Sequence, residues 1–265
     1  MPKLSNSLSP DSFVNKTKVE DKIPQFHLSC KKGDIAENVI LSGDPQRIEL
    51  FSNFLDEISW SYRGRGFVLF TGKCRKINLT LASTGIGAPS TAIVIEELAN
   101  VGAKNFIRVG TTGAIQPFIE IGDFVLPIAC YKGEGTSKYY VPPEYPAVAT
   151  YDLFNLLVKH VYEYSLKNKI NYHVGIVATN DAFYRETPDL LAKLANLNIL
   201  SLDMETSILF TIGSVKRLSV SSLLYVNGNL IKGREPFIDA SRISKNVWRD
   251  IFNIVVNAFE EHTSL

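Results

Sequence analysis

Short apolar runs rich in β-branched residues alternate with longer helix-like stretches along most of the chain. The runs predict strands at 38–42, 67–71, 77–82, 106–109, 124–130, 172–179 and 220–226. The stretches between them predict helices at 89–102, 151–166, 203–214 and 241–261. Strands and helices in alternation form mostly parallel sheets that are covered by helices on both faces. We therefore expect an α/β fold, to which the paired strands around Gly72 add a mixed or barrel-like part.

The chain reads as one domain with a short arm in front of it. Residues 1–22 mix Ser, Asn, Lys and Asp and have no apolar segment, so they predict a flexible N-terminal arm and not a signal peptide. No linker interrupts residues 23–265, and no apolar run approaches the roughly 20 residues that span a bilayer. We expect a single domain over 23–265, with no membrane partner and a cytoplasmic location.

Composition excludes several kinds of ligand. The chain has 28 Lys and Arg against 27 Asp and Glu, so its net charge of +1 creates no overall field that would attract nucleic acid or an anionic membrane. Its 3 cysteines form no close pair, which favours free thiols, and its 4 histidines lack the spacing of metal ligands. We expect no metal and no nucleic-acid partner, so a charged ligand must be held by local groups.

Ligands of parallel α/β sheets bind beyond the carboxyl ends of the strands, and glycine-rich turns follow several predicted strands here. The first is Gly43-Asp44-Pro45-Gln46-Arg47. One interpretation is structural, with Asp44 capping a helix and Pro45 fixing its first turn. The other is functional, with the Gly43 backbone and the Arg47 guanidinium binding an anion. The motif alone leaves both open.

The second turn, residues 83–90, nearly matches the dinucleotide fingerprint G-x-G-x-x-G. Ser90 stands at the third glycine, and no acidic residue follows at about 20 residues to bind a ribose diol. A dinucleotide site is therefore not expected, whereas a tight strand-to-helix turn beside another ligand remains open.

Two further segments carry charge. Arg108 closes an apolar predicted strand and is followed by Gly110, Thr111, Thr112 and Gly113. A buried arginine requires an anionic partner, which could be a phosphate or a carboxylate in a structural ion pair. Asp203-Met204-Glu205 precedes a predicted helix, where acidic residues either cap the helix or accept hydrogen bonds from sugar hydroxyls.

Taken together, these segments resemble the nucleoside phosphorylase family in its hexameric branch. This branch contains the uridine phosphorylases, the bacterial- and archaeal-type purine nucleoside phosphorylases and related 5′-methylthioadenosine enzymes, and the uridine phosphorylase-like members are the most similar overall. The resemblance rests on six segments in the family's order: 43–47, 65–72, 83–90, 106–115, 180–184 and 203–205. It implies a three-layer αβα sandwich with a mixed, partly barrel-like central sheet.

The resemblance also assigns the substrates to residues. It implies a phosphate site formed by Gly43 through its backbone, Arg47, Arg108 and Thr111, with Arg65 reaching in from a neighbouring subunit. It implies a ribose site formed by Met204, Glu205 and a neighbour's His27, and a base pocket formed by Thr112, Gly113 and Phe183. Such sharing between subunits implies a homo-oligomer, expected to be a hexamer built from dimers.

The implied reaction is phosphorolysis of a ribonucleoside to the free base and ribose 1-phosphate. Inorganic phosphate is the co-substrate and attacks C1′ while the glycosidic bond breaks, so no cofactor is expected. Catalysis then depends on positioning and on charge stabilisation. Arg108 and Glu205 are the expected catalytic residues, because one orients the phosphate and the other the ribose.

Three departures from the family pattern affect substrate and activity. Asp203 replaces the usual Glu, and Gly228 stands where purine-specific members carry an acid that protonates N7. The Gln and Arg pair that contacts uracil is not evident in residues 185–188, whereas loop 139–149 resembles the uridine members. These features favour uridine, with a purine nucleoside such as inosine, guanosine, adenosine or 5′-methylthioadenosine as the alternative.

Two other functions remain open. A nucleosidase would use water and would not need three arginines for phosphate. A non-catalytic nucleoside-binding protein would tolerate Asp203 and Gly228. Phosphate-dependent release of free base distinguishes these possibilities.

Overall fold

The computed structural model describes residues 23–232 and 242–264, so the predicted N-terminal arm lies outside the described residues. Its strands are β1 (Asn38–Ser42), β2 (Glu57–Gly64), β3 (Phe67–Cys74), β4 (Ile77–Ser83), β5 (Asn105–Ala114), β6 (Phe124–Gly133), β7 (Ala147–Val148), β8 (Tyr172–Asn180), β9 (Ser201–Asp203) and β10 (Ser219–Asn229). Its helices are α2 (Pro45–Ser52), α3 (Ala88–Asn100), α4 (Tyr151–Asn168), α5 (Pro188–Asn196), α6 (Thr206–Lys216) and α7 (Lys245–Thr263), with 3₁₀ turns η1 (Ser137–Tyr139) and η2 (Phe183–Arg185).

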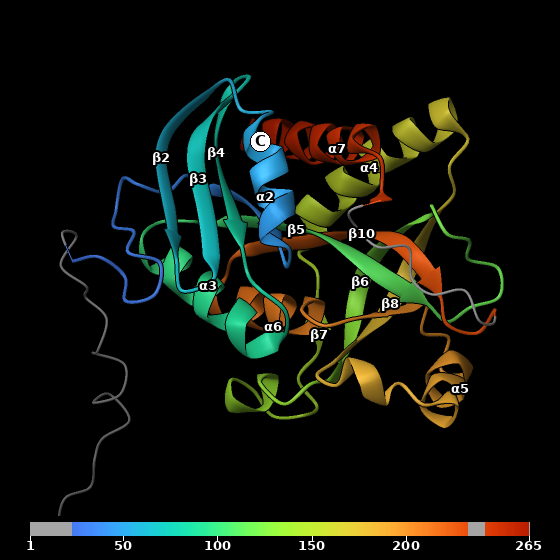
Figure 1. Ribbon diagram of the computed structural model, residues 1–265. Helices are drawn as coiled ribbons and strands as arrows, with labels where there is room; N and C mark the ends of the chain where they lie inside the picture. Colours follow the sequence, from blue (N-terminus) through green and yellow to red (C-terminus); the bar gives the residue numbers. More distant parts are fainter. Residues whose placement is uncertain (1–22, 233–241, 265) are drawn as a thin grey trace, which may run out of the picture.

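Part of the sheet closes on itself. β10 is parallel to β5 and antiparallel to β6, and the path continues through β8 and β9 back to β5. β1, β4, β3 and β2 extend outward from β5 as a further wing (Figure 1). The predicted mixed, partly barrel-like sheet is therefore confirmed.

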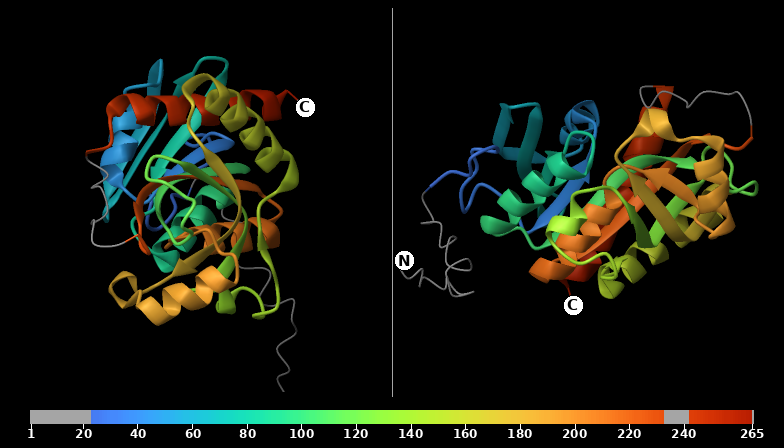
Figure 2. Two further views of the ribbon diagram at one scale, coloured as in Figure 1. Left: turned by 90° about the vertical axis from the view of Figure 1, so that its right-hand side faces the viewer. Right: turned by 90° about the horizontal axis from the view of Figure 1, so that it is seen from below.

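Helices cover both faces of this sheet, which gives three layers. α3 and α6 lie side by side on one face, whereas α2, α4 and α7 pack on the other (Figures 1 and 2). The strand β1 shows why: Val39 and Leu41 enter the core under α3 and α6, and Ile40 enters the core under α2, α4 and α7. Successive strand residues point to opposite faces, so a strand that is apolar throughout must be covered on both.

The helix α6 is buried along most of its length. Residues 206–213 are all buried, and Phe210 is inaccessible to solvent. A helix that is apolar on all sides requires neighbours on all sides, and α6 contacts α3, β6, β7, β8 and β10. This packing fixes the start of α6, where Glu205 is the N-cap residue.

Several boundaries differ from the sequence-based expectation. β5 continues to Ala114 and β10 to Asn229, so Arg108 lies inside a strand and does not close it. Glycines suggested turns at these places, but the two strands pair from Asn105 to Ala114 and override that local preference. Asp203 ends β9, so the predicted helix at 203–214 begins later, at Thr206.

None of the helices in the described part of the chain has the length and apolar character needed to cross a membrane.

Phe210→Ala should lower the free energy of unfolding by about 3–5 kcal/mol, because it opens a cavity at a fully buried position. Urea denaturation followed by circular dichroism measures this change. Val215→Ala on the same helix is the control, since Val215 is 47% exposed and should change stability by less than about 1 kcal/mol. Equal losses in the two variants would contradict the packing described for α6.

Candidate active site

Three of the predicted turns meet at one place. A Cβ atom added to Gly43 would lie 3.3 Å from the carbonyl oxygen of Gly85 and 3.7 Å from Oε1 of Glu205. The same Glu205 oxygen accepts a hydrogen bond of 2.9 Å from the backbone N–H of Gly87. The turns after β1 and β4 and the start of α6 therefore form one site, at the carboxyl ends of neighbouring strands.

Arg108 is buried at the centre of this site. Its Nε donates to Oδ2 of Asp203 over 3.2 Å, and its Nη2 forms a short ion pair with Oε2 of Glu205. Burial alone would lower the pKa of Arg108, but the carboxylates of Glu205 and Asp203 raise this pKa above its ordinary value. The structural interpretation, an arginine held by carboxylates, is thus what the structure shows.

The shape of β5 makes room for the Arg108 guanidinium. The side chain folds back along the strand, so a Cβ added to Gly110 would lie 2.7–2.9 Å from the guanidinium atoms. Residues two apart on a strand share a face, which explains why Gly110 is the neighbour that must lack a side chain. Glycine at this position therefore gives Arg108 space and does not mark the end of the strand.

Glu205 is buried to the same degree, with 4% of its surface exposed. Burial raises the pKa of its carboxyl group, and the attraction of Arg108 opposes this rise. Its two oxygens bond to Gly87 and Arg108, so the carboxylate faces the junction of the three turns. Met204 beside it is half-buried.

Asp203 has a role that the sequence did not reveal. Its carboxylate accepts a 2.6 Å bond from the Thr179 hydroxyl, bonds from the N–H and hydroxyl of Thr206, and the bond from Arg108. The side chain has no exposed surface. Asp203 therefore holds Arg108 in place from behind, and it ties β8 and β9 to the start of α6.

Arg47 is the second buried arginine, and Asp44 in the same turn confirms the structural interpretation. Asp44 caps α2 by accepting from the N–H of Gln46 over 2.8 Å, and Pro45 follows it. Arg47 donates to the hydroxyl of Ser42 over 2.9 Å and to the carbonyl oxygen of Val109 over 3.2 Å. The capping turn thus carries Arg47 to the strand beside Arg108, and binding of an anion by Gly43 and Arg47 stays a prediction.

His27 and Arg65 lie on a different surface. The Arg65 guanidinium lies 4.8 Å from the centre of the Phe26 ring, which itself contacts the His27 ring at 4.9 Å. Glu97 bonds to Nδ1 of His27 over 2.6 Å and accepts from the His27 N–H. Among the described residues, no hydrogen bond or ion pair joins His27 or Arg65 to the Arg108 cluster.

The other residues predicted for the site lie on strand β5 and, in the case of Phe183, just after β8. Thr111 is half-buried, and Thr112 uses its hydroxyl to bond the carbonyl oxygen of Leu202 over 2.7 Å. Gly113 pairs with Gly228 of β10 and with Leu202 of β9. Phe183 follows β8 in η2 and is 40% exposed.

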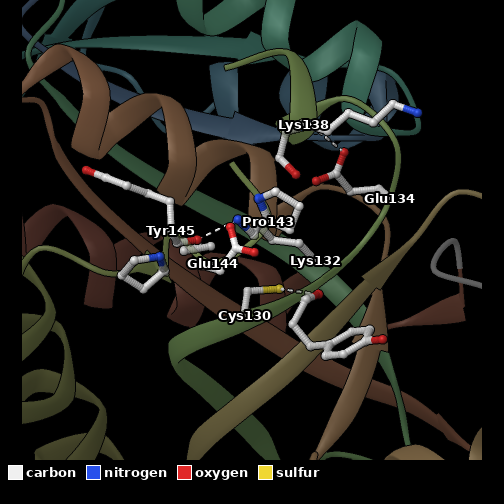
Figure 3. A pocket seen from close by; sticks show the side chains of 11 residues that line it. Cys130, Lys132, Glu134, Lys138, Pro143, Glu144 and Tyr145 are labelled. Carbon is white, nitrogen blue, oxygen red and sulfur yellow. Dashed lines mark hydrogen bonds between the residues drawn. The ribbon is translucent and has the colours of Figure 1, made fainter. Parts of the chain in front are cut away.

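A cavity of about 510 Å³ lies under the loop that joins β6 to β7 (Figure 3). It is lined by Cys130, Lys132, Glu134 and loop residues, and it does not include the arginines of the predicted phosphate site. Glu134 accepts from the Ser207 hydroxyl over 2.9 Å, and Ser207 follows Glu205 by two residues on α6. The cavity therefore lies next to α6, which carries Glu205 at its start, but Arg47 and Arg108 do not line it.

Within residues 23–232 and 242–264, no three His, Cys, Asp or Glu side chains are grouped so that they could hold a metal ion.

Comparisons with known proteins agree with this architecture. Residues 37–246 match the family described as the phosphorylase superfamily. A uridine phosphorylase from Thermococcus kodakarensis is 40% identical over 220 residues, which cover 78% of each chain. A guanosine phosphorylase from Halorubrum lacusprofundi is 36% identical and covers 88% of this chain and 97% of its own. A DeoD-type purine nucleoside phosphorylase from Bacillus cereus is 32% identical over 79% of this chain and 88% of its own.

A solved structure gives the same result. The crystal structure of a uridine phosphorylase from Vibrio fischeri superposes with a TM-score of 0.77 at 30% identity, covering 91% of this chain and 98% of its own. With a matched family profile, these relatives and this shared fold, the chain belongs to the phosphorylase superfamily, among the nucleoside phosphorylases.

Proposed function

We propose that the protein catalyses the phosphorolysis of a ribonucleoside, with uridine as the favoured substrate, to the free base and ribose 1-phosphate. The observation that carries this proposal is the pair of buried arginines beside the Glu205 carboxylate, at the point where three strand-end turns meet. The uridine phosphorylases among its relatives support it. A cytoplasmic role in nucleoside breakdown and salvage is part of the proposal.

The ion pair between Arg108 and Glu205 suggests how the two substrates are held. Phosphate provides Arg108 with bidentate oxygen acceptors, so it replaces Glu205 as the partner of Nη2. The released carboxylate then accepts hydrogen bonds from the ribose 2′- and 3′-hydroxyls. Asp203 keeps its bond to Nε throughout and holds the guanidinium in line with C1′. Catalysis proceeds by positioning and charge stabilisation, without a cofactor.

The preference for uridine rests on the base pocket. Gly228 pairs directly with Gly113, the residue expected to line this pocket. In the family pattern the acid that protonates a purine N7 stands at position 228, where this chain has a glycine that cannot supply one. Lys232 is the first cationic residue after this turn, and it is in an ion pair with Glu120. The next one, Arg234, lies outside the described residues.

A nucleoside panel tests the function directly. We expect free uracil to be released from uridine only when inorganic phosphate is present, and faster than any purine base from its nucleoside. Liquid chromatography of the bases measures both rates. Faster release from inosine, guanosine, adenosine or 5′-methylthioadenosine would assign the enzyme to purines. Release without phosphate would indicate a nucleosidase, and binding without turnover would indicate a nucleoside-binding protein.

Arg108→Ala should lower kcat/KM for phosphorolysis at least about 100-fold, because one charged contact to a transition state contributes about 2–4 kcal/mol. Steady-state assays measure the loss, and circular dichroism checks that the variant is folded. Arg75→Ala is the matched control, since Arg75 is an exposed arginine bonded to Asn253 and Asn257. Near-normal rates in a folded Arg108→Ala variant would rule out the phosphate assignment.

We further propose that active sites are shared between subunits of a homo-oligomer, a hexamer built from dimers. His27 and Arg65 lie together around the exposed Phe26 ring, on a surface without a recorded bond to Arg108 among the described residues. A group of this kind can complete the site of a neighbouring subunit, with Arg65 contacting phosphate and His27 the ribose. The exposure of Phe26, 74% in the single chain, fits such a contact.

Mixing subunits tests this sharing. Arg65→Ala and Arg108→Ala subunits should each be nearly inactive alone. After co-refolding, some mixed dimers contain one site with both arginines intact, so roughly a quarter of the wild-type activity should return if subunits pair at random. Activity is compared before and after mixing at a constant total concentration. No recovery in dimers shown to be mixed, or a fully active monomer, would contradict the shared site.

A further inference from the structure

The two buried arginines of the site differ in how they are held. Arg108 bonds to two carboxylates, whereas the recorded hydrogen bonds of Arg47 go to neutral groups, the Ser42 hydroxyl and the Val109 carbonyl oxygen. Both of these bonds use Nη1 of Arg47. Among the described residues, no acceptor is recorded for its Nη2 and Nε.

Within residues 23–232 and 242–264, Arg47 is thus a buried charge without a bonded counter-ion. Only 5% of its surface is exposed. Burial lowers the pKa of Arg47 to about 10, with Asp44 acting in the opposite direction and Arg108 adding to the decrease. A buried cation whose own hydrogen bonds go to neutral groups is costly, so an anion that approaches its remaining guanidinium nitrogens is strongly favoured.

An aromatic ring from a distant part of the sequence covers the guanidinium. The central carbon of Arg47 lies 4.1 Å from the ring centre of Trp248, a residue of the C-terminal helix α7 that is 3% exposed. Cation–π attraction is strongest for Trp and increases when the pair is shielded from water. Trp248 is thus the only group on α7 with a recorded contact to Arg47 among the described residues.

The indole is itself fixed by neighbouring rings. It contacts Phe51 at 6.4 Å and Tyr225 of β10 at 6.0 Å between ring centres. Phe51 stands one turn after Arg47 on α2, so both residues lie on the helix face that meets α7. These contacts restrict the indole, and therefore the guanidinium beneath it, to one orientation.

We propose that Trp248 is a positioning residue for phosphate, which holds the Arg47 guanidinium through its indole face so that Nη2 and Nε remain free for phosphate oxygens. The inference rests on the proposed phosphorylase function, and it extends the phosphate site to the C-terminal helix. Trp248 does not itself touch the phosphate.

Kinetics of Trp248→Leu give the first test. We expect the KM for phosphate to rise about tenfold, while the KM for the nucleoside changes less than about threefold. Trp248→Phe keeps an aromatic face and should restore most of the phosphate affinity. Phe252→Leu is the matched control, because Phe252 lies one turn later on α7 and packs on Phe51 but has no recorded contact with Arg47. A similar rise in both Leu variants, or none in Trp248→Leu, would overturn the proposal.

Fluorescence gives a test that does not need turnover. The chain has 2 tryptophans, so Trp60→Phe leaves Trp248 as the sole indole emitter. Titration with inorganic phosphate, without nucleoside, should change its emission saturably, and sodium chloride at equal ionic strength should not. Adding Arg47→Ala should abolish the response.

The positioning role of Trp248 and the proposed phosphorylase function would be contradicted by different results. If calorimetry shows phosphate binding to the Trp60→Phe variant and the emission stays constant, Trp248 does not sense Arg47 and the inference is wrong, even where phosphorolysis is normal. If the emission responds but no nucleoside is cleaved, the positioning of Arg47 stands and the proposed reaction is wrong.

Discussion

The buried contact of Arg108 with Asp203 and Glu205 is the interaction on which the site depends. It joins the middle of β5 to the end of β9 and the adjoining start of α6, which follow Arg108 by 95 and 97 residues in the sequence. Removing one partner of such a group leaves an uncompensated charge in the interior, at a cost of about 3–5 kcal/mol. Neighbouring residues support this contact. Gly110 leaves space for the Arg108 guanidinium, and the hydroxyls of Thr179 and Thr206 donate to the Asp203 carboxylate.

The closed part of the sheet makes this contact possible. Because β10 pairs with both β5 and β6, the five strands of the ring have a fixed stagger, and Arg108 faces Asp203 in one register only. The helices then supply the other side chains of the site. α6 supplies Glu205 at its N-cap, α2 supplies Arg47 in its first turn, and α7 supplies Trp248 across the top of Arg47. The chain as a whole is nearly neutral, so it is the fold, and not a surplus of basic residues, that brings these charged side chains together at the site.

Much of this was predictable from the sequence, because local signals and topology agreed. β1 was predicted with its observed bounds, and the turn at Gly43 carries the cap and the arginine that the motif suggested. β2 was missed because it forms the outer edge of the wing, where mostly exposed residues such as Glu57, Ser61 and Arg63 conceal the strand. The end of β5 was placed too early because glycine signals a turn locally, whereas pairing with β10 keeps the strand extended. Asp203 and Trp248 could not be assigned, since their roles arise from contacts between distant segments.

The bond between Glu97 and His27 also determines where the proton of the imidazole lies. A carboxylate oxygen accepts hydrogen bonds, so Nδ1 is the ring nitrogen that donates to Glu97. In the neutral form of such a ring the lone pair lies on Nε2, which then accepts from a hydroxyl that approaches it. The Glu97 carboxylate thus selects the tautomer of the neutral ring, and with it the polarity of any hydrogen bond made at Nε2.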